Sequence, residues 1–266
     1  MKQALTFPSS PKAATALLLL IGYIGIGFLS IQFAILPFGS FSVIWFAAGC
    51  GLVIMLETGR LGIALVFLGS YILNTPTYYA YLNQSGSKNA FLLALISGLV
   101  PAAIDSWQSA MAAKAWRNSV RKNHHAPLQA PVDLPYFWLK ICFMPALITM
   151  SVWHILLTLS QVTPYISLAN NLQQMVLLIM GDTAGLFIIA PIYASWKSGT
   201  LKNNFRSIVP YLVLLCAIVA LGFSLYTYLM MLILPVLLLI AIRFRLAGTA
   251  LALLVVFTLS IIGSTY

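Results

Sequence analysis

Nine apolar stretches follow one another along this sequence, with only short polar connections between them. They lie at 13–36, 41–57, 61–81, 90–116, 136–159, 173–196, 208–224, 228–242 and 247–263. A helix that crosses a bilayer needs about 20 mostly apolar residues, and backbone polar groups in lipid are satisfied only within helices or closed barrels. The short seventh and eighth stretches are compatible with a tilted pair or with a partly re-entrant hairpin. The sequence therefore predicts an all-α, polytopic transmembrane helical bundle of about nine spans, forming a single domain over residues 1–266.

Composition excludes a soluble domain, because 61% of the residues are hydrophobic, 7% are charged and the mean hydropathy is +0.99. The net charge of +10 does not indicate a nucleic-acid partner, since the basic residues lie in short loops where they would contact anionic lipid. Cys50, Cys142 and Cys216 all lie in apolar stretches, and we expect them to be packing residues. We expect the lipid bilayer as a partner, and no metal site or cofactor.

The basic residues predict the orientation of the chain. With a cytoplasmic N-terminus, twelve of the fourteen Lys and Arg residues fall on the inner side. They are Lys2, Lys12, Arg60, Lys114, Arg117, Arg121, Lys122, Lys197, Lys202, Arg206, Arg243 and Arg245. Glu57 and Arg60, three residues apart, are expected to form a local ion pair of little energetic weight. An odd number of spans leaves Tyr266 outside, so we expect a truncation before a last span and a cytoplasmic output domain.

No enzyme motif is present in the sequence. There is no glycine-rich phosphate loop, HExxH, CxxC or G-x-S-x-G pattern. We therefore expect no catalytic residues in this chain. His124 and His125 lie in the basic inner loop, where solvated side chains are expected.

Asp182 lies well inside the apolar stretch 173–196. A charge at that depth costs several kcal/mol unless it is paired, hydrated or neutralised. Gly181 and Gly185 would let a neighbouring helix approach closely. Two interpretations remain open: an aspartate that hydrogen-bonds to a neighbouring span, or a residue that senses a signal or ligand.

Asp105 and Gln108 are three residues apart and share one helix face in the fourth stretch. If the fourth and sixth stretches pack together, these residues, Asp182 and His154 would line one polar cavity, or form a purely structural hydrogen-bond cluster. His154 is either a neutral core histidine or a proton- or ligand-responsive group. Tryptophans near the outer half suit a ligand pocket or an aromatic belt equally. The candidate sensing residues are Asp182, Asp105, Gln108, His154, Trp45 and Trp107.

Several short segments occur in a characteristic order. They are Trp45-Phe46-Ala47-Ala48-Gly49, Arg60-Leu61-Gly62 with Gly69 and Asn74, Asp105-Ser106-Trp107-Gln108, Gly181-Asp182-Thr183-Ala184-Gly185 with Pro191 and Trp196, and Arg243-Phe244-Arg245-Leu246-Ala247-Gly248-Thr249-Ala250. Together they resemble the MASE1 family of integral membrane sensory domains over roughly residues 15–266. Phe46 replaces the family's usual proline, and Gln108 replaces its usual glutamate, which removes a charge from the predicted cavity. On this resemblance the structural motif residues are Gly49, Gly62, Gly181, Gly185 and Pro191.

The resemblance implies a multi-pass protein of the bacterial inner (plasma) membrane that acts in signal transduction. Such domains precede a diguanylate cyclase, a cyclic-di-GMP phosphodiesterase or the histidine kinase of a two-component system. Output modules of this kind usually work as dimers, so the resemblance implies a homodimer. We therefore expect a sensory or localisation domain that regulates a cytoplasmic output domain in cis, through a small ligand or a membrane partner protein. The alternatives are a small-solute membrane transporter, which polar residues at mid-membrane also suit, and a membrane scaffold.

Overall fold

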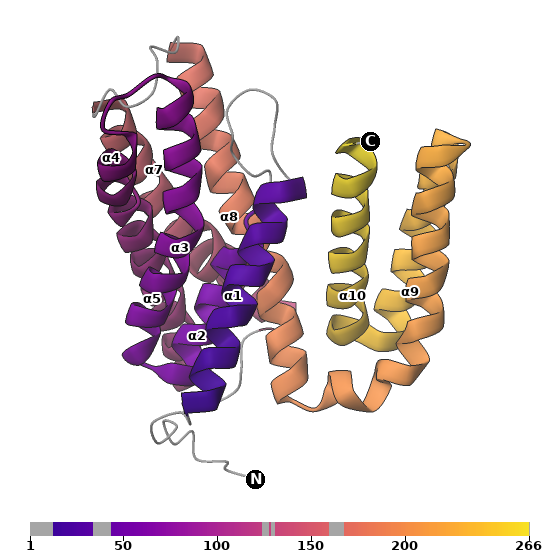
Figure 1. Ribbon diagram of the computed structural model, residues 1–266. Helices are drawn as coiled ribbons and strands as arrows, with labels where there is room; N and C mark the ends of the chain where they lie inside the picture. Colours follow the sequence, from indigo (N-terminus) through magenta and orange to yellow (C-terminus); the bar gives the residue numbers. More distant parts are fainter. Residues whose placement is uncertain (1–12, 34–43, 124–127, 129–130, 160–167, 266) are drawn as a thin grey trace.

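The chain forms an all-α bundle in a computed structural model that describes residues 13–33, 44–123, 128, 131–159 and 168–265. Figure 1 shows its helices running roughly side by side. Within the described residues, seven helical segments are long and apolar enough to cross a membrane, and an eighth apolar helix is shorter. The protein is therefore a multi-span helical membrane protein. Lys2, Lys12, His124, His125 and Tyr266 lie outside the described residues.

The helical elements agree with the predicted apolar stretches. They are α1 (Ala13–Phe33), α2 (Phe46–Thr58), α3 (Leu61–Gln84), α4 (Ala90–Ser97), α5 (Leu99–Asn123), η1 (Pro131–Asp133), α6 (Leu134–Tyr136), η2 (Phe137–Phe143), α7 (Met144–Leu159), α8 (Leu168–Lys197), α9 (Thr200–Ser224), η3 (Thr227–Leu232) and α10 (Ile233–Thr265). α4 and α5 together make one apolar segment, as do α6, η2 and the first part of α7. The seventh predicted stretch is the apolar part of α9, whose 25 residues are enough to span a bilayer.

The short helix α2 lies at the centre of the bundle. Its 13 residues span only about 20 Å, but Ala47, Leu52, Ile54 and Met55 are all buried in the largest core cluster. α2 packs against α1, α3, α5 and α8. Because protein surrounds it, the non-helical backbone at its ends need not face lipid.

α10 reverses direction near its middle. Arg245 has non-helical backbone angles (φ 52°, ψ −139°). A Cβ on Gly222 of α9 would contact Met230, and a Cβ on Gly263 would contact the neighbouring Phe223. Residues 230 and 263 thus lie at the same end of α9, whereas an uninterrupted helix would separate them by about 50 Å. The two halves on either side of Arg245 match the eighth and ninth predicted stretches.

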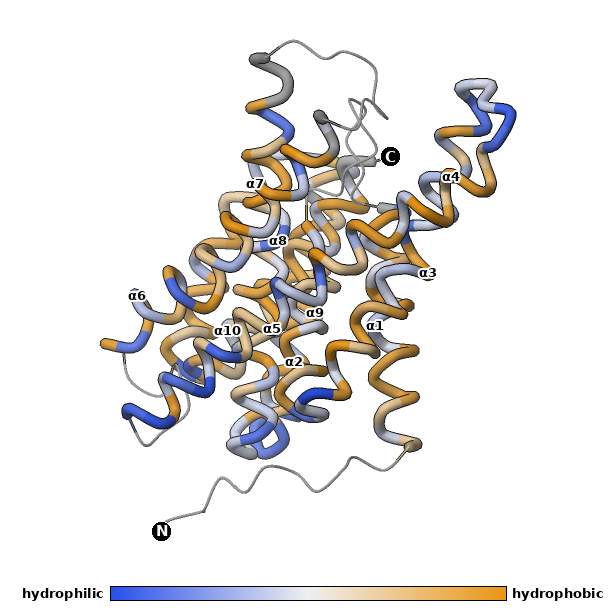
Figure 2. Tube along the Cα trace, turned by 90° about the vertical axis from the view of Figure 1, so that its left-hand side faces the viewer, coloured by the Kyte–Doolittle hydropathy of each residue, from blue (hydrophilic) through white to orange (hydrophobic). Residues whose placement is uncertain are grey.

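Polar contacts join α2, α5 and α8 at the end where all three helices finish. Lys197 Nζ lies 2.7 Å from Glu57 Oε1, and Arg117 donates a hydrogen bond to the Met55 carbonyl oxygen. Hydrophilic residues gather toward the same end in Figure 2. Lys197 and Arg117, two of the predicted inner basic residues, therefore lie at one end of the bundle, and the side of the membrane that this end faces stays a prediction. The expected local pair of Glu57 with Arg60 is wrong, because Glu57 pairs instead with Lys197 across the bundle.

Candidate functional site

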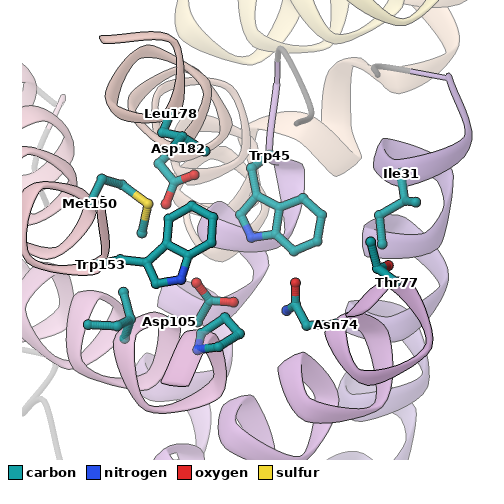
Figure 3. A pocket seen from close by; sticks show the side chains of 11 residues that line it. Ile31, Trp45, Asn74, Thr77, Asp105, Met150, Trp153, Leu178 and Asp182 are labelled. Carbon is teal, nitrogen blue, oxygen red and sulfur yellow. The ribbon is translucent and has the colours of Figure 1, made fainter. Parts of the chain in front are cut away.

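A cavity of about 90 Å³ opens between five helices of the bundle and the residue that precedes α2. Figure 3 shows the side chains that line it, seen from close by. They are Ile31, Trp45, Asn74, Thr77, Pro101, Ile104, Asp105, Met150, Trp153, Leu178 and Asp182. The cavity thus brings together three residues that the sequence singled out: Trp45, Asp105 and Asp182.

Asp182 contributes a buried carboxylate to this cavity from α8. Its side chain is 4% exposed, and its Oδ2 atom has no hydrogen-bond partner among the described residues. A buried polar atom without a partner costs free energy comparable to a lost hydrogen bond, and more when it is charged. A cavity of this size has room for several waters or a small polar ligand. Gln108 Nε2, on the neighbouring α5, is likewise buried without a hydrogen-bond partner among the described residues. The two side chains therefore leave a polar group at the cavity wall that water or a small polar ligand can bind.

Asp105, on α5, is in contrast held by hydrogen bonds from two other helices. Its Oδ2 accepts one from Ser70 Oγ at 2.6 Å and one from Tyr23 Oη at 3.4 Å. Asn74 Nδ2 in turn donates to Ser70 Oγ at 3.0 Å. Gly69 leaves the space for Tyr23, because a Cβ there would lie 2.6 Å from the tyrosine ring. Asp105 is therefore fixed by α1 and α3, while Asp182 is not fixed in this way.

The glycines beside Asp182 bring the start of α2 into backbone contact with α8. The backbone N–H of Trp45 donates to the Gly181 carbonyl oxygen at 3.1 Å. A Cβ on Gly185 would lie 2.0 Å from the Trp45 carbonyl oxygen, and one on Gly49 would lie 2.4 Å from that of Gly185. Only glycine permits such an approach, and the approach sets the Trp45 indole beside the cavity (Figure 3).

The remaining two motif residues lie away from the cavity lining. Gly62, next to the turn between α2 and α3, packs tightly on α2, since a Cβ there would lie 3.0 Å from Met55 Cα. Pro191 is buried within α8, where it lacks an N–H for the helical hydrogen bond.

The other candidate sensing residues do not line the cavity. Gln108 is 2% exposed and lies beside the Asp182 carboxylate, where its Oε1 accepts a 3.0 Å hydrogen bond from Thr149 Oγ1 of α7. His154 is buried on α7, and its Nδ1 has no partner among the described residues. Trp107 is 43% exposed and faces away from the core.

Several residues at the cavity were not singled out from the sequence as candidates for sensing. Trp153, Asn74 and Thr77 line it, and Tyr23 and Ser70 bind Asp105. The spacing of Ser70 and Asn74, four residues apart in an apolar stretch, is a usable signal for a shared helix face. No sequence pattern distinguishes Trp153 or Tyr23 as a cavity residue, because aromatic residues are common throughout the apolar stretches.

Metal binding has no visible support in this region. No group of three or more His, Cys, Asp and Glu side chains that could hold a metal ion occurs among the described residues.

Comparison with known proteins adds no identification. No family model, no curated protein and no solved structure matches the chain. The apolar helices establish a multi-span helical membrane protein embedded in lipid, and the role of the cavity is inferred from its own residues.

Proposed function

We propose that this chain is a membrane-embedded sensory domain in which a small ligand at the Asp182 cavity regulates a cytoplasmic signalling output. The observation that carries the proposal is the buried Asp182 carboxyl group at a cavity between five helices, with an Oδ2 atom that has no hydrogen-bond partner among the described residues. A ligand that pairs with this carboxylate favours whichever helix packing makes the better contact, and so shifts the population of packing states.

The helices around the cavity also carry the polar contacts at the end of the bundle where Glu57, Arg117 and Lys197 lie, which we call the basic end. α8 bears Asp182 in the cavity and, about 16 Å further along, Tyr193. Tyr193 Oη donates a 2.6 Å hydrogen bond to Glu57 Oε1 of α2, and Lys197 Nζ lies 2.7 Å from the same oxygen. A shift of α8 against α2 at the cavity would therefore move Tyr193 and Lys197 relative to Glu57. Small helix shifts of this kind transmit signals in other proteins.

The resemblance to MASE1 sensory domains supports the finer parts of the proposal. We propose nine crossings with a cytoplasmic N-terminus, counting the short α2 and both halves of α10, in a bacterial inner membrane. The output domain, acting in cis, would be a diguanylate cyclase, a cyclic-di-GMP phosphodiesterase or a histidine kinase, with the protein working as a homodimer. The membrane chain itself performs no catalysis in this proposal.

A small-solute transporter is the second candidate function. The cavity favours it too, because ionisable residues at membrane depth mark substrate pathways as well as sensing sites. Uptake of solute into proteoliposomes that contain the purified protein separates the two, since a sensor requires no net transport.

An Asp182→Asn substitution in the full-length protein tests the sensory role. Asparagine keeps the shape of the side chain and can still hydrogen-bond across helices, but it cannot carry the negative charge. We expect normal membrane abundance with the output fixed in one state. The measurement is second-messenger level or autophosphorylation across growth conditions, alongside quantitative membrane immunoblots.

Asp133→Asn is the matched control, because it removes a carboxylate from η1, outside the cavity. It should leave the range of outputs unchanged. Normal abundance of the Asp182→Asn protein together with an unchanged range of outputs would reject the sensory role. Loss of solute uptake in this variant would support the transporter instead.

A further inference from the structure

Two carboxyl groups line the cavity, and no positive side chain stands beside them among the described lining residues. They belong to Asp105 and Asp182, two of the four acidic residues of the chain, and the described part of the lining includes no Lys, Arg or His. The Oδ2 atom of Asp105 already accepts hydrogen bonds from Ser70 and Tyr23, so Asp105 is less available to a ligand than Asp182 is. Asp182 is 4% exposed, and its Oδ2 atom has no hydrogen-bond partner among the described residues, as is also the case for Gln108 Nε2.

Two indole rings stand beside these carboxylates. Figure 3 shows Trp45 and Trp153 next to Asp105 and Asp182 in the cavity. The face of an indole ring attracts a cation, most strongly where water is excluded. Aliphatic side chains such as Leu178 and Ile104 form much of the remaining wall, which suits a cation with an alkyl group.

The polar groups of the opposite wall are acceptors. Asn74 donates its amide N–H₂ to Ser70, which leaves its carbonyl oxygen for the cavity. Thr77 Oγ1 donates to the Leu73 carbonyl oxygen at 3.3 Å, so it can only accept from a ligand. With the carboxyl group of Asp182, the cavity offers acceptors to a molecule that has several N–H donors.

We infer that the cavity binds a small primary alkylammonium ion, of which methylammonium is the simplest, with Asp182 as its charge partner. This inference rests on the proposed function and names the ligand class for its site. The volume of about 90 Å³ is smaller than the engineered cavity of about 150 Å³ that holds benzene, and methylammonium, with two heavy atoms, fits within it. Indole rings and aliphatic groups take the place of the oxygen shell that a hard metal cation requires.

The test is a titration of the purified full chain in phosphatidylcholine nanodiscs with methylammonium chloride. Isothermal titration calorimetry measures binding, and tryptophan fluorescence reports on the cavity. Methanol is the neutral ligand of the same size, and sodium chloride at equal ionic strength is the control for charge alone. We expect saturable binding of methylammonium, no binding of methanol and no competition by sodium.

Variants locate the site. Asp182→Asn should weaken methylammonium binding by at least about 10-fold, the effect expected for losing a charged hydrogen-bond partner. Asp133→Asn should bind as the unaltered protein does. Trp153→Phe should remove part of the fluorescence response, whereas Trp196→Phe, which alters a tryptophan outside the cavity, should not.

The comparison of methylammonium with methanol and sodium on the unaltered protein tests the inferred ligand class even if a variant fails to accumulate. No saturable binding, equal binding of methanol, or full competition by sodium would overturn the inference, as would undiminished binding to Asp182→Asn. Methylammonium binding with a normal output of Asp182→Asn would uphold the site and reject the sensory function. A locked output without methylammonium binding would reject this ligand class alone.

Discussion

The backbone N–H of Trp45 donates a 3.1 Å hydrogen bond to the carbonyl oxygen of Gly181, one residue before Asp182. This bond joins the start of α2 to the middle of α8. It sets an indole ring and a buried carboxylate at the same cavity. The contact is possible because Gly185 and Gly49 carry no Cβ where the two backbones meet.

Gly185→Ala should destabilise the protein by about 1–3 kcal/mol, the usual cost of overpacking. The added Cβ would lie 2.0 Å from the Trp45 carbonyl oxygen, and a backbone atom cannot move aside cheaply. The variant should also weaken ligand binding, because α2 and its Trp45 would shift away from α8. Thermal unfolding in detergent and the titration described above measure the two effects.

Gly22→Ala is the control for Gly185→Ala. Gly22 is also helical, but a Cβ there would meet nothing within 4 Å. It should be neutral or slightly stabilising, since alanine favours helix over glycine. Equal stability of the two alanine variants would contradict the close approach of α2 and α8.

Ser70→Ala should destabilise the protein by about 1–3 kcal/mol, because it leaves the half-buried Asp105 carboxyl group short of a partner. Asp105 would lose its 2.6 Å donor and keep only the 3.4 Å contact with Tyr23. Ser224→Ala, which removes an exposed hydroxyl bonded within its own helix, should change stability by less than about 0.5 kcal/mol. A thermal shift no larger than that of Ser224→Ala would show that Ser70 does not hold Asp105.

At the basic end, Tyr193→Phe should cost more stability than Lys197→Met. The Tyr193 hydroxyl donates a 2.6 Å hydrogen bond to a carboxylate, a type of bond worth about 1.5–3 kcal/mol. The Lys197 side chain is 55% exposed, and exposed ion pairs contribute about 0–1 kcal/mol. Unfolding of both variants and of Glu57→Gln double variants gives the coupling energies, and the reverse order would contradict this ranking.

Cysteine labelling tests the predicted orientation. In a background in which Cys50, Cys142 and Cys216 are replaced, a membrane-impermeant reagent applied from outside should label Ser85→Cys and not Asn118→Cys. Both positions are exposed, whereas Ser119 is only 3% exposed and would label poorly on either side. Labelling of position 118 from outside in intact cells would reverse the orientation.

The apolar stretches and the charges between them determined the helical architecture from sequence alone. Whether a segment belongs in lipid depends on its own length and hydropathy, because the backbone must bond within the helix. For this reason even the two halves of α10 were visible as separate stretches around Arg245. The carboxylates Asp105 and Asp182 could likewise be singled out, since charge at membrane depth is costly wherever it occurs.

Only the tertiary structure decided which of these side chains meet. Successive helix residues point about 100° apart, so Trp153 lines the cavity while its neighbour His154 does not. The rotation of each helix is set by packing against others, as Tyr23 is set against Gly69 and Asp105. Glu57 has an arginine three residues away but pairs across the bundle with Tyr193, 136 positions later, and Lys197. Sequence spacing fixes the faces within a helix, whereas partners between helices depend on the packing of the whole bundle.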